Sequence, residues 1–478
     1  MSDVAAQIAA LEDAGQNELA AALAGLSGGR RKKLSAQVAE LDLGLIGSLV
    51  DRFVTAGEGE AALGEVTEAP TIPLPADAEA ERAEADARSA GENLLRSDRV
   101  SAVLLAGGQG SRLGFDGPKG NYPFAPITAR TLFSHHAAKI AALRERYGCS
   151  LPWYILTSPQ NNDVTRASFE EAGWFGLDPD SIRFVIQGTL PAVDARTGAI
   201  LREAPDRLAL SPDGHGGLLS ALRRSGALDE MSDSGITTMF TFQVDNPLVR
   251  VCRPEFLGYH AQAGADMSNT AVRKVAPEEK MGVVARVDGR PGVVEYSDLP
   301  DELAEMRNPD GELTYWAGSI AVHCIEVAFA RSLTDGGLKL PYHRALKKVP
   351  HVGADGKQVT PDEPNAIKFE TFLFDALPAA DASITIEAAR EDEFAPIKNA
   401  DGVDSAESAR LLLNDLYARW FEAAGLAVPR DADGAPPDLE IDPRFALDAA
   451  ELAAKLPPGF VVDGPLALGL DEGPTTAR

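Results

Sequence analysis

Short apolar runs separated by helical stretches constrain the fold of this chain more than any other feature. The first run, Val100–Ala106, ends before a pair of glycines, and three more occur at 151–158, 181–187 and 236–244. Runs of this length without polar alternation are typical of parallel strands buried on both faces. Amphipathic stretches such as 132–147 lie between them. The pattern therefore predicts an open α/β sheet with helices on both faces.

The sequence on either side of this sheet has a different character. Residues 1–55 are rich in Ala and Leu, contain no Pro, and have apolar positions at three- or four-residue steps, which predicts amphipathic helices. An acidic connector with several prolines follows, and after about residue 425 the chain is rich in Pro and Asp. We expect an N-terminal helical region and linker over 1–98, an α/β domain over 99–424 and a small C-terminal domain over 425–478.

Charge and cysteine content exclude several classes of protein. The chain has 45 Lys and Arg against 72 Asp and Glu, and its formal net charge of −27 repels nucleic-acid phosphates and anionic lipids. Its 3 cysteines are far apart, which argues against a disulfide framework or a zinc ribbon. The sequence has no pattern of a secretory leader and no run of apolar residues that could span a membrane. We expect a cytoplasmic protein without nucleic-acid or membrane partners.

The segment after the first predicted strand has the features of an anion-binding loop. It is Ala-Gly-Gly-Gln-Gly-Ser-Arg-Leu-Gly over 106–114, and a Pro-Lys-Gly sequence follows shortly afterwards. Glycines such as Gly107 and Gly108 permit unusual backbone dihedrals, so several N–H groups can converge on one anion, and Arg112 and Lys119 add positive charge. We interpret the segment as a polyphosphate cradle; a tight structural turn is the alternative.

Two common nucleotide-binding motifs are absent from this segment. A dinucleotide fingerprint would have glycine in place of Leu113 and an acidic residue near position 130, which is Arg130. No G-x-x-x-x-G-K-[ST] sequence of a P-loop can be written here either. A pyridine-nucleotide oxidoreductase is therefore a poor alternative.

The same segment resembles a known family. Its G-G-x-G-x-R-L pattern followed by P-K-G is similar to that of nucleoside-diphosphate-sugar pyrophosphorylases, and more narrowly to the UDP-sugar pyrophosphorylase family that includes eukaryotic-type UDP-N-acetylglucosamine pyrophosphorylases. The resemblance covers about residues 99–424 in family order. It implies a Rossmann-like nucleotidyltransferase sheet and transfer of a uridylyl group from UTP to a sugar 1-phosphate, with release of pyrophosphate. The further segments that carry it are Gln187–Pro191, Pro212–Gly217, Val244–Asn246, Gly282–Val284, Val293–Ser297, Asn365–Lys368 and Arg390–Asn399.

The resemblance implies a metal site. Transfer between phosphates needs alignment and charge neutralisation more than a covalent nucleophile. Asp245 directly follows the predicted strand 236–244, where a carboxylate can hold a divalent ion that bridges phosphate oxygens. By resemblance it is the metal aspartate, and Mg²⁺ is the implied cofactor. Without the family, an Asx turn closed by Asn246-Pro247 is an alternative explanation.

Other residues match positions that contact the nucleotide. Lys368 and Lys398 match catalytic lysines that face the phosphates, and we expect the acidic stretch 390–393 to hold Lys398 in place. Gln187 ends a predicted strand, and its amide can pair with a uracil edge that presents N3–H and a carbonyl. By resemblance, Gly214 and His215 belong to a second glycine loop that covers the base and ribose. A simple turn or helix start is the alternative for His215.

The resemblance also implies sugar contacts. Gly282 supplies a bare backbone amide, and Glu295 a carboxylate that can accept hydrogen bonds from sugar hydroxyls. Phe372 and Phe374 match aromatic residues near the acetyl pocket of the N-acetylhexosamine enzymes; a strand of alternating core aromatics is the alternative. Ser319 stands where the N-acetylglucosamine branch usually has Asn.

The segments that match the family do not all indicate the same sugar substrate. Ser319 departs from the N-acetylglucosamine pattern, and His215 is more like the glucose and broad-specificity relatives. The Asn365–Lys368 segment and the Phe-x-Phe-Asp segment instead indicate N-acetylhexosamine. We expect a magnesium-dependent UTP:N-acetylhexosamine-1-phosphate uridylyltransferase, with glucose 1-phosphate or several sugar phosphates as the alternative. A catalytically silent nucleotide-sugar-binding protein is a second alternative, which the retained cations and Asp245 disfavour.

Overall fold

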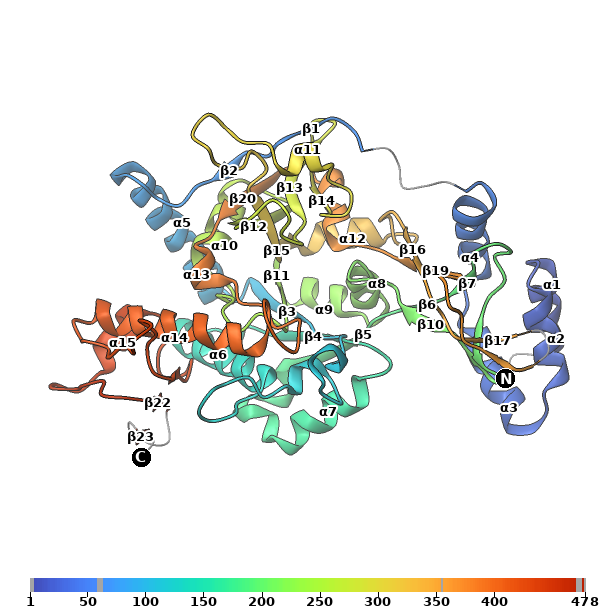
Figure 1. Cartoon of the computed structure of the whole chain (residues 1–478), viewed down its shortest axis with the longest axis horizontal. Coiled ribbons are helices and arrows are strands. Elements are labelled where there is room, and N and C mark those ends of the chain that lie inside the picture. The colour runs from blue at the N-terminus through green and yellow to red at the C-terminus, as the bar shows by residue number, and fades with distance from the viewer. Residues whose placement is uncertain (1–3, 58–62, 354–355, 470–474, 477–478) are drawn as a thin grey trace. The chain divides into compact units, whose positions relative to one another are not determined.

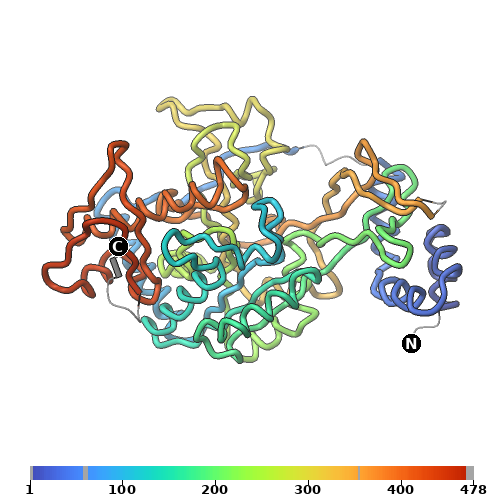
Figure 2. Tube along the Cα trace, turned by 60° about the horizontal axis from the view of Figure 1, so that its bottom comes forward, coloured from blue at the N-terminus to red at the C-terminus, as the bar shows by residue number. Residues whose placement is uncertain are grey.

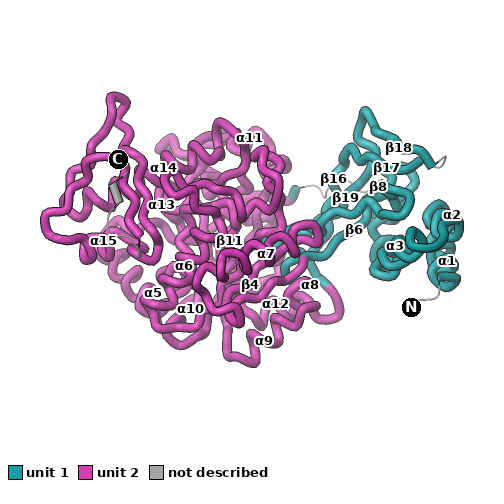
Figure 3. The backbone as a smooth tube through the Cα atoms, turned by 90° about the horizontal axis from the view of Figure 1, so that it is seen from below, with its two compact units in different colours: residues 1–63, 187–220, 338–375 teal, residues 64–186, 221–337, 376–478 magenta. Residues whose placement is uncertain are grey.

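The computed structural model describes residues 4–57, 63–353, 356–469 and 475–476 of the chain (Figure 1). Its contacts divide the chain into two compact units, drawn in different colours in Figure 3. Both units are assembled from separated stretches of sequence, whereas the sequence predicts three continuous domains. Unit 1 comprises the described parts of 1–63, 187–220 and 338–375, and unit 2 those of 64–186, 221–337 and 376–478.

Unit 2 is built on a mixed sheet that contains the four predicted parallel strands. In spatial order they are β11 (Thr238–Gln243), β3 (Val100–Leu105), β4 (Trp153–Thr157) and β5 (Ile182–Ile186). β3 and β4 are buried along their whole length, and the predicted α/β sheet is confirmed. β5 is only partly buried, and Ile186 is 46% exposed, because this strand lies at the edge of the sheet.

The other half of the sheet is partly antiparallel, which the sequence does not predict. β15 (Ala317–Glu326) pairs antiparallel with β11 and with β12 (Met267–Arg273). β20 (Ser383–Glu387) and β2 (Thr71–Ile72) continue the sheet in parallel order. A hairpin of β13 (Val283–Val287) and β14 (Arg290–Val294) branches from β15 and also pairs with β1 (Val66–Glu68). Because Val283 pairs with Val294, Gly282 and Glu295 flank the open end of the hairpin.

Local signals set the ends and the packing of the helices in unit 2. α6 (Leu132–Tyr147) begins after Thr131, whose side chain accepts a hydrogen bond from the Ser134 N–H at 3.2 Å, and ends at Gly148 in the left-handed conformation. α5 (Ala78–Arg96) packs closely on α10 (Pro254–Gln262), where a Cβ on Gly91 would lie 1.9 Å from the Pro254 carbonyl oxygen. None of the described helices is long and apolar enough to cross a membrane. The other helices of this unit used below are α13 (Arg390–Glu393) and α14 (Ala406–Ala423).

The C-terminal segment of the described chain shares the core of the sheet. It contains β21 (Leu439–Ile441), α15 (Ala449–Lys455) and β22 (Leu466–Leu468). Leu439 and Leu466 belong to the same buried cluster as Trp153, and the Tyr417 hydroxyl of α14 donates to the Ile441 carbonyl at 3.2 Å. The segment predicted as a small domain over 425–478 therefore belongs to unit 2, and its residues 470–474 and 477–478 lie outside the described residues.

Unit 1 combines the predicted N-terminal helices with strands from two later parts of the chain, which lie beside the blue helices in Figure 2. The strands β7 (Val193–Asp194), β19 (Ala366–Glu370) and β16 (His343–Lys347) form one sheet, and β6 (Thr189–Pro191) pairs with β10 (Leu210–Pro212). Leu11, Leu23 and Leu34 are buried in one cluster with Val193 and Phe369. The predicted helices are confirmed, and the strands cover their apolar faces, which short helices cannot bury alone. The helices are α1 (Val4–Asp13), α2 (Asn17–Gly25), α3 (Gly28–Ala39) and α4 (Leu43–Val50).

Candidate functional site

The predicted anion-binding loop leaves β3 at its carboxyl end and turns back on itself. The Lys119 N–H donates to the Gly108 carbonyl at 3.1 Å, and Asn161 Nδ2 donates to the Ala106 carbonyl at 2.9 Å. Gly107 is half-buried and Gly108 is exposed, and a Cβ on Gly108 would meet no atom within 4 Å. Two carbonyls of the loop are therefore turned towards protein partners, while the backbone at Gly108 stays open to an approaching ligand.

Lys119 connects this loop to the residue that follows β11. Its Nζ lies 3.2 Å from Asp245 Oδ2, and the two side chains are 18% and 14% exposed. The contact spans 126 residues of sequence, and it forms because β3 and β11 are parallel neighbours in which Leu105 pairs with Gln243. Both segments leave the sheet at the same edge, which is the usual place for ligands in open α/β sheets. Arg112, on the same loop, is exposed.

The turn after Asp245 is made by its neighbour Asn246. Asn246 Oδ1 accepts from the Leu248 N–H at 3.3 Å and from the Ala395 N–H at 3.0 Å, while Nδ2 donates to the Glu393 carbonyl at 2.7 Å. Asn246 therefore supplies the side chain of the Asx turn that was the alternative explanation for this segment. The Asp245 carboxylate instead contacts Lys119.

A cavity of about 200 Å³ lies beside Asp245 in unit 2. Its lining includes residues predicted for three different roles, namely Asp245 for the metal, Lys398 for phosphate, and Gly282 and Ser319 for the sugar. The Ser319 N–H donates to the Gly282 carbonyl at 2.8 Å, and a Cβ on Gly282 would lie 3.4 Å from Glu295 Oε1. The structure therefore gathers these four predicted residues around one cavity, with Glu295 next to Gly282.

Several lining residues of this cavity were not expected from the sequence, among them Gln243, Lys280 and Ala321. Gln243 ends β11, and Lys280 is an exposed cation two residues before Gly282, so their places next to recognised motifs were the available signals. Ala321 adopts a left-handed φ of 54° within β15, which is uncommon for a residue other than glycine and is often found at functional sites. No feature of the sequence indicates that conformation.

The expectation for the acidic stretch beside Lys398 was wrong. Two carboxylates of this stretch, Glu393 and Asp392, form ion pairs with Arg253 and Arg419, because α13 directs them towards these arginines. Lys398 Nζ instead lies 3.8 Å from Asp404 Oδ2. Burial raises the pKa of Asp404 above its ordinary value, and the charge of Lys398 acts in the opposite direction. The charge near Lys398 therefore comes from a residue that follows it in the chain.

Unit 1 contains the residues predicted to contact the base. Gln187 Nε2 donates to the Gly214 carbonyl at 2.5 Å. Gly214 has a φ of +84°, and a Cβ there would lie 2.2 Å from the Thr371 carbonyl oxygen. Only glycine fits this position, because both the backbone conformation and the close approach exclude a side chain. The second glycine loop is thus fixed directly beside Gln187 and the segment around Thr371.

His215 lies in an aromatic cluster with the two predicted acetyl-pocket residues. Its ring centroid is 5.4 Å from that of Phe372 and 5.4 Å from that of Phe374, and Phe372 also stacks on His343 at 4.6 Å. His215 Nδ1 accepts from the Leu373 N–H at 3.0 Å. Burial, with a smaller contribution from His343, lowers the pKa of His215 to about 4. At neutral pH the ring is therefore uncharged and carries its proton on Nε2.

The remaining predicted residue of this unit, Lys368, lies on β19 opposite Ala345 of β16 and is half-buried. Phe374 is 6% exposed, as the core alternative requires, whereas Phe372 is only partly buried. The predicted residues thus fall into two sets. Unit 2 holds Gly107, Gly108, Arg112, Lys119, Asp245, Gly282, Glu295, Ser319 and Lys398, and unit 1 holds Gln187, Gly214, His215, Lys368, Phe372 and Phe374.

Comparison with known proteins decides the family. Residues 54–424 match the family model described as UTP--glucose-1-phosphate uridylyltransferase. The chain belongs to this family. Among its relatives, UDP-N-acetylhexosamine pyrophosphorylase-like protein 1 of Xenopus tropicalis is 42% identical over 345 residues, covering 70% of this chain and 67% of the relative. The UDP-N-acetylglucosamine pyrophosphorylase of Saccharomyces cerevisiae is 36% identical over 347 residues, covering 71% and 73%.

A solved structure supports the same assignment. The uridine diphosphate N-acetylglucosamine pyrophosphorylase of Trypanosoma brucei, in complex with an inhibitor, matches this uridylyltransferase-family chain with a TM-score of 0.81 and 27% identity over 95% of each chain. The resemblance to UDP-sugar pyrophosphorylases, the α/β fold class and the assignment as a nucleotidyltransferase are therefore confirmed. The roles of individual site residues stay predictions.

Proposed function

We propose that this chain transfers a uridylyl group from UTP to an N-acetylhexosamine 1-phosphate, which yields UDP-N-acetylglucosamine or UDP-N-acetylgalactosamine and pyrophosphate. The observation that carries the proposal is the contact between Lys119 and Asp245, at 3.2 Å, where the glycine loop leaves the sheet. The choice of sugar is supported by relatives named UDP-N-acetylhexosamine and UDP-N-acetylglucosamine pyrophosphorylases.

The reaction is an attack by a phosphate oxygen of the sugar 1-phosphate on the α-phosphorus of UTP. A new P–O bond forms, the bond between the α-phosphorus and the bridging oxygen breaks, and its electron pair leaves with pyrophosphate. The protein must align two anions and neutralise the charge that develops on them. We assign this work to the backbone at Gly107 and Gly108, to Arg112 and Lys119 on the loop, and to Lys398 at the cavity.

We also propose that Asp245 holds Mg²⁺. Lys119 contacts Oδ2 of the carboxylate, and Oδ1 is left for an ion. The described residues contain no group of three or more His, Cys, Asp or Glu side chains that could hold a metal by themselves. A single carboxylate fits Mg²⁺, which keeps several waters and takes other ligands from substrate phosphates. Bound there, Mg²⁺ would supply positive charge next to the reacting phosphates.

We assign the contacts with the base and the sugar to predicted residues of unit 1 and of unit 2. Gln187 uses one amide hydrogen for the Gly214 carbonyl, so its Oε1 can accept the N3–H of uracil. Glu295 and Ser319, beside the 200 Å³ cavity, offer oxygen atoms to sugar hydroxyls. Phe372, which is partly exposed, offers an aromatic surface for the acetyl group.

A substrate panel tests the proposal. Pyrophosphate release is measured for UTP and CTP against N-acetylglucosamine, N-acetylgalactosamine and glucose 1-phosphates. We expect release that requires UTP and is at least about tenfold faster, in kcat/KM, with an N-acetylhexosamine phosphate than with glucose 1-phosphate. A clear preference for glucose 1-phosphate would overturn the choice of sugar. UDP-sugar binding without release from any pair would instead identify a nucleotide-sugar-binding protein.

A further inference from the structure

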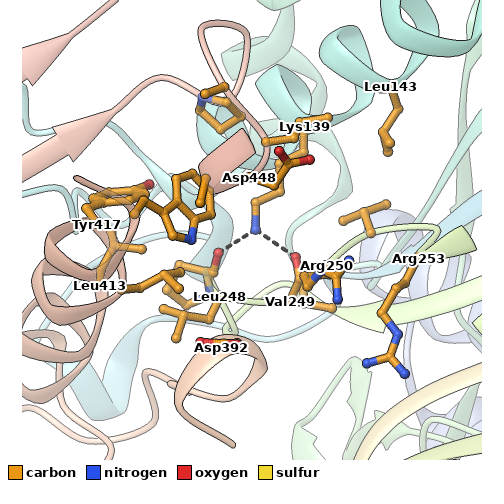
Figure 4. A pocket seen from close by; sticks show the side chains of 18 of the residues that line it. Lys139, Leu143, Leu248, Val249, Arg250, Arg253, Asp392, Leu413, Tyr417 and Asp448 are labelled. Atoms are coloured by element: carbon orange, nitrogen blue, oxygen red, sulfur yellow. Dashed lines mark hydrogen bonds between the residues drawn. The ribbon is translucent and has the colours of Figure 1, made fainter. Parts of the chain in front are cut away.

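Unit 2 contains a second, larger cavity of about 430 Å³ that shares no lining residue with the cavity beside Asp245. Its wall comes from α6, from residues 247–254 after β11, from α14 and from residues 443–449 (Figure 4). The volume is within the range of about 300–1,000 Å³ that is usual for small-molecule sites. The proposed uridylyl transfer does not use this cavity.

Lys139 of α6 is the notable polar group of this cavity. Its Nζ donates to the Pro247 carbonyl at 2.5 Å and to the Val249 carbonyl at 2.7 Å (Figure 4). An ammonium group carries three hydrogens, so one remains for a ligand. Burial lowers the pKa of Lys139 to about 7, and the charge of Glu393 acts in the opposite direction. No carboxylate of the described chain lies within 4.0 Å of this ammonium group.

The arginines around the cavity differ from Lys139 because each already has an acidic partner. Arg146 lies 2.8 Å from Asp448, and Arg250 lies 3.3 Å from Glu255. Among the basic lining residues that the structure describes, Lys139 is therefore the cation without a carboxylate partner. The other pairs are Arg88 with Glu255, Arg253 with Glu393, and Arg419 with Asp392.

The rest of the wall determines what kind of anion would fit. Leu143, Leu248, Leu413, Trp420 and Leu447 give one part of the wall an apolar surface, beside the paired arginines. A phosphate dianion would require a second unpaired cation to offset its loss of hydration, whereas one ammonium group matches one carboxylate. The apolar side chains can cover a hydrocarbon body and so contribute to affinity.

We propose that this cavity binds a small monocarboxylic acid with an apolar body. The carboxylate accepts the free hydrogen of Lys139, and the hydrocarbon part packs against Leu248, Leu413 and Trp420. The acid provides the counter-charge that the buried ammonium group lacks.

The proposed site is connected to Asp245 through the backbone. His136 Nε2 donates to the Val244 carbonyl at 3.1 Å, and Lys139 donates to the Pro247 carbonyl, so α6 holds the chain on both sides of Asp245. A carboxylate that accepts the third hydrogen draws the ammonium group towards itself, and we expect this to lengthen the second of these contacts. We expect occupancy to change the affinity for UTP, and UTP to change the affinity for the acid by the same factor. This coupling rests on the proposed function, whereas binding of the acid does not.

Binding of the acid should weaken as the pH rises. Burial, followed by the charge of Lys139, lowers the pKa of His135 well below its ordinary value. Against the effect of burial, Arg250 and Arg253 lower the pKa of Glu255, and the Glu451 N–H and then Arg146 lower the pKa of Asp448. Lys139 loses its proton as the pH rises through about 7, so affinity for the acid should fall by about tenfold per pH unit above that value. The charged and titratable groups around Lys139 are Arg88 on α5, His135, His136, Arg146 and Tyr147 on α6, Arg250 and Arg253 after β11, Glu255 on α10, Asp392 and Glu393 on α13, Tyr417 and Arg419 on α14, and Asp448 in the C-terminal segment.

Isothermal titration calorimetry of the full chain tests the proposal with octanoate and neutral octanamide as probes. At pH 6.5 we expect octanoate to bind at least about tenfold more tightly than octanamide, because only the acid can pair with Lys139. Lys139→Met should abolish this preference. Lys33→Met, at an exposed lysine of α3, should retain it. Ala423→Trp keeps Lys139 but narrows the cavity from α14, and should exclude both probes.

Three results would overturn the proposal. They are equal affinities of the wild-type chain for octanoate and octanamide, an unchanged preference in Lys139→Met, and complete displacement of octanoate by UTP, which would place the acid in the nucleotide site. Since calorimetry requires no turnover, a failure here is separate from a failure of the substrate panel.

Discussion

Lys119 and Lys139 are two lysines of unit 2 with opposite surroundings. Lys119 lies 3.2 Å from the Asp245 carboxylate, whereas Lys139 donates to the carbonyls of Pro247 and Val249 and has no carboxylate within 4.0 Å among the described residues. The first lysine is held with an acidic partner at the proposed reaction site. The second retains an unpaired charge beside a cavity. The partner, and not the residue type, therefore decides whether each lysine orients a site or is open to a ligand.

Removing the Asp245 carboxylate, the partner of Lys119, should have the largest effect on activity. In Asp245→Asn we expect kcat to fall by about 10²–10³-fold, because the variant loses the proposed Mg²⁺ ligand and leaves Lys119 without its partner. Pyrophosphate release over a series of Mg²⁺ concentrations measures the change. Asp180→Asn, at an exposed position, is the matched control and should keep its activity. Unchanged turnover and Mg²⁺ dependence in Asp245→Asn would assign the metal to a different residue.

Substitution of Lys119 should have the next largest effect on activity. Lys119→Met is expected to lower kcat by about 10–100-fold, because a cation near the reacting phosphates is lost. Since Lys119 and Asp245 are in contact, the combined variant should lose less activity than the product of the two single losses. A double-mutant cycle in kcat measures this coupling. Strictly multiplicative effects would show that the two side chains act independently.

A substitution at the 200 Å³ cavity tests whether the two regions are separate. We expect Ser319→Asn to raise the preference for N-acetylglucosamine 1-phosphate over glucose 1-phosphate by about 3–10-fold in kcat/KM, because an amide can donate to the acetyl carbonyl. Octanoate affinity measured by calorimetry should stay constant, since the two cavities have no lining residue in common. A parallel loss of octanoate binding would contradict that separation.

The smallest expected effect is the contribution of Lys139 to the pH dependence of the free energy of unfolding. Its folded-state pKa of about 7 lies below the value for an unfolded chain, so the unfolded state binds more protons at higher pH and stability rises with pH in that window. Relative to Lys139→Met, we expect the wild-type free energy of unfolding to increase by about 2 kcal/mol between pH 7 and pH 9. Urea denaturation at both pH values measures the difference. Parallel changes in the two proteins would show that Lys139 is not the titrating group.

Features that act over a few residues could be predicted from the sequence. The apolar runs gave strands at nearly the expected bounds, and the stretch 132–147 forms α6. The glycine loop and Asp245 were recognised because each follows a strand in a family-like pattern. In contrast, the sequence predicts that the acidic stretch 390–393 holds Lys398, but Asp392 and Glu393 pair with arginines from other segments. Sequence proximity was a poor guide there, because an ion pair depends on which segments pack together.

The sequence by itself determined the local elements, such as β3 with its glycine turn and α6 between Thr131 and Gly148. Only the tertiary structure decided which charges are paired. Lys119 meets Asp245 across 126 residues because β3 and β11 are parallel neighbours, while Lys139 lies among backbone carbonyls and apolar side chains. The physical reason is range: strand and helix preferences and capping act between neighbours in the chain. Burial and ion pairing depend on contacts between segments that only the complete fold brings together.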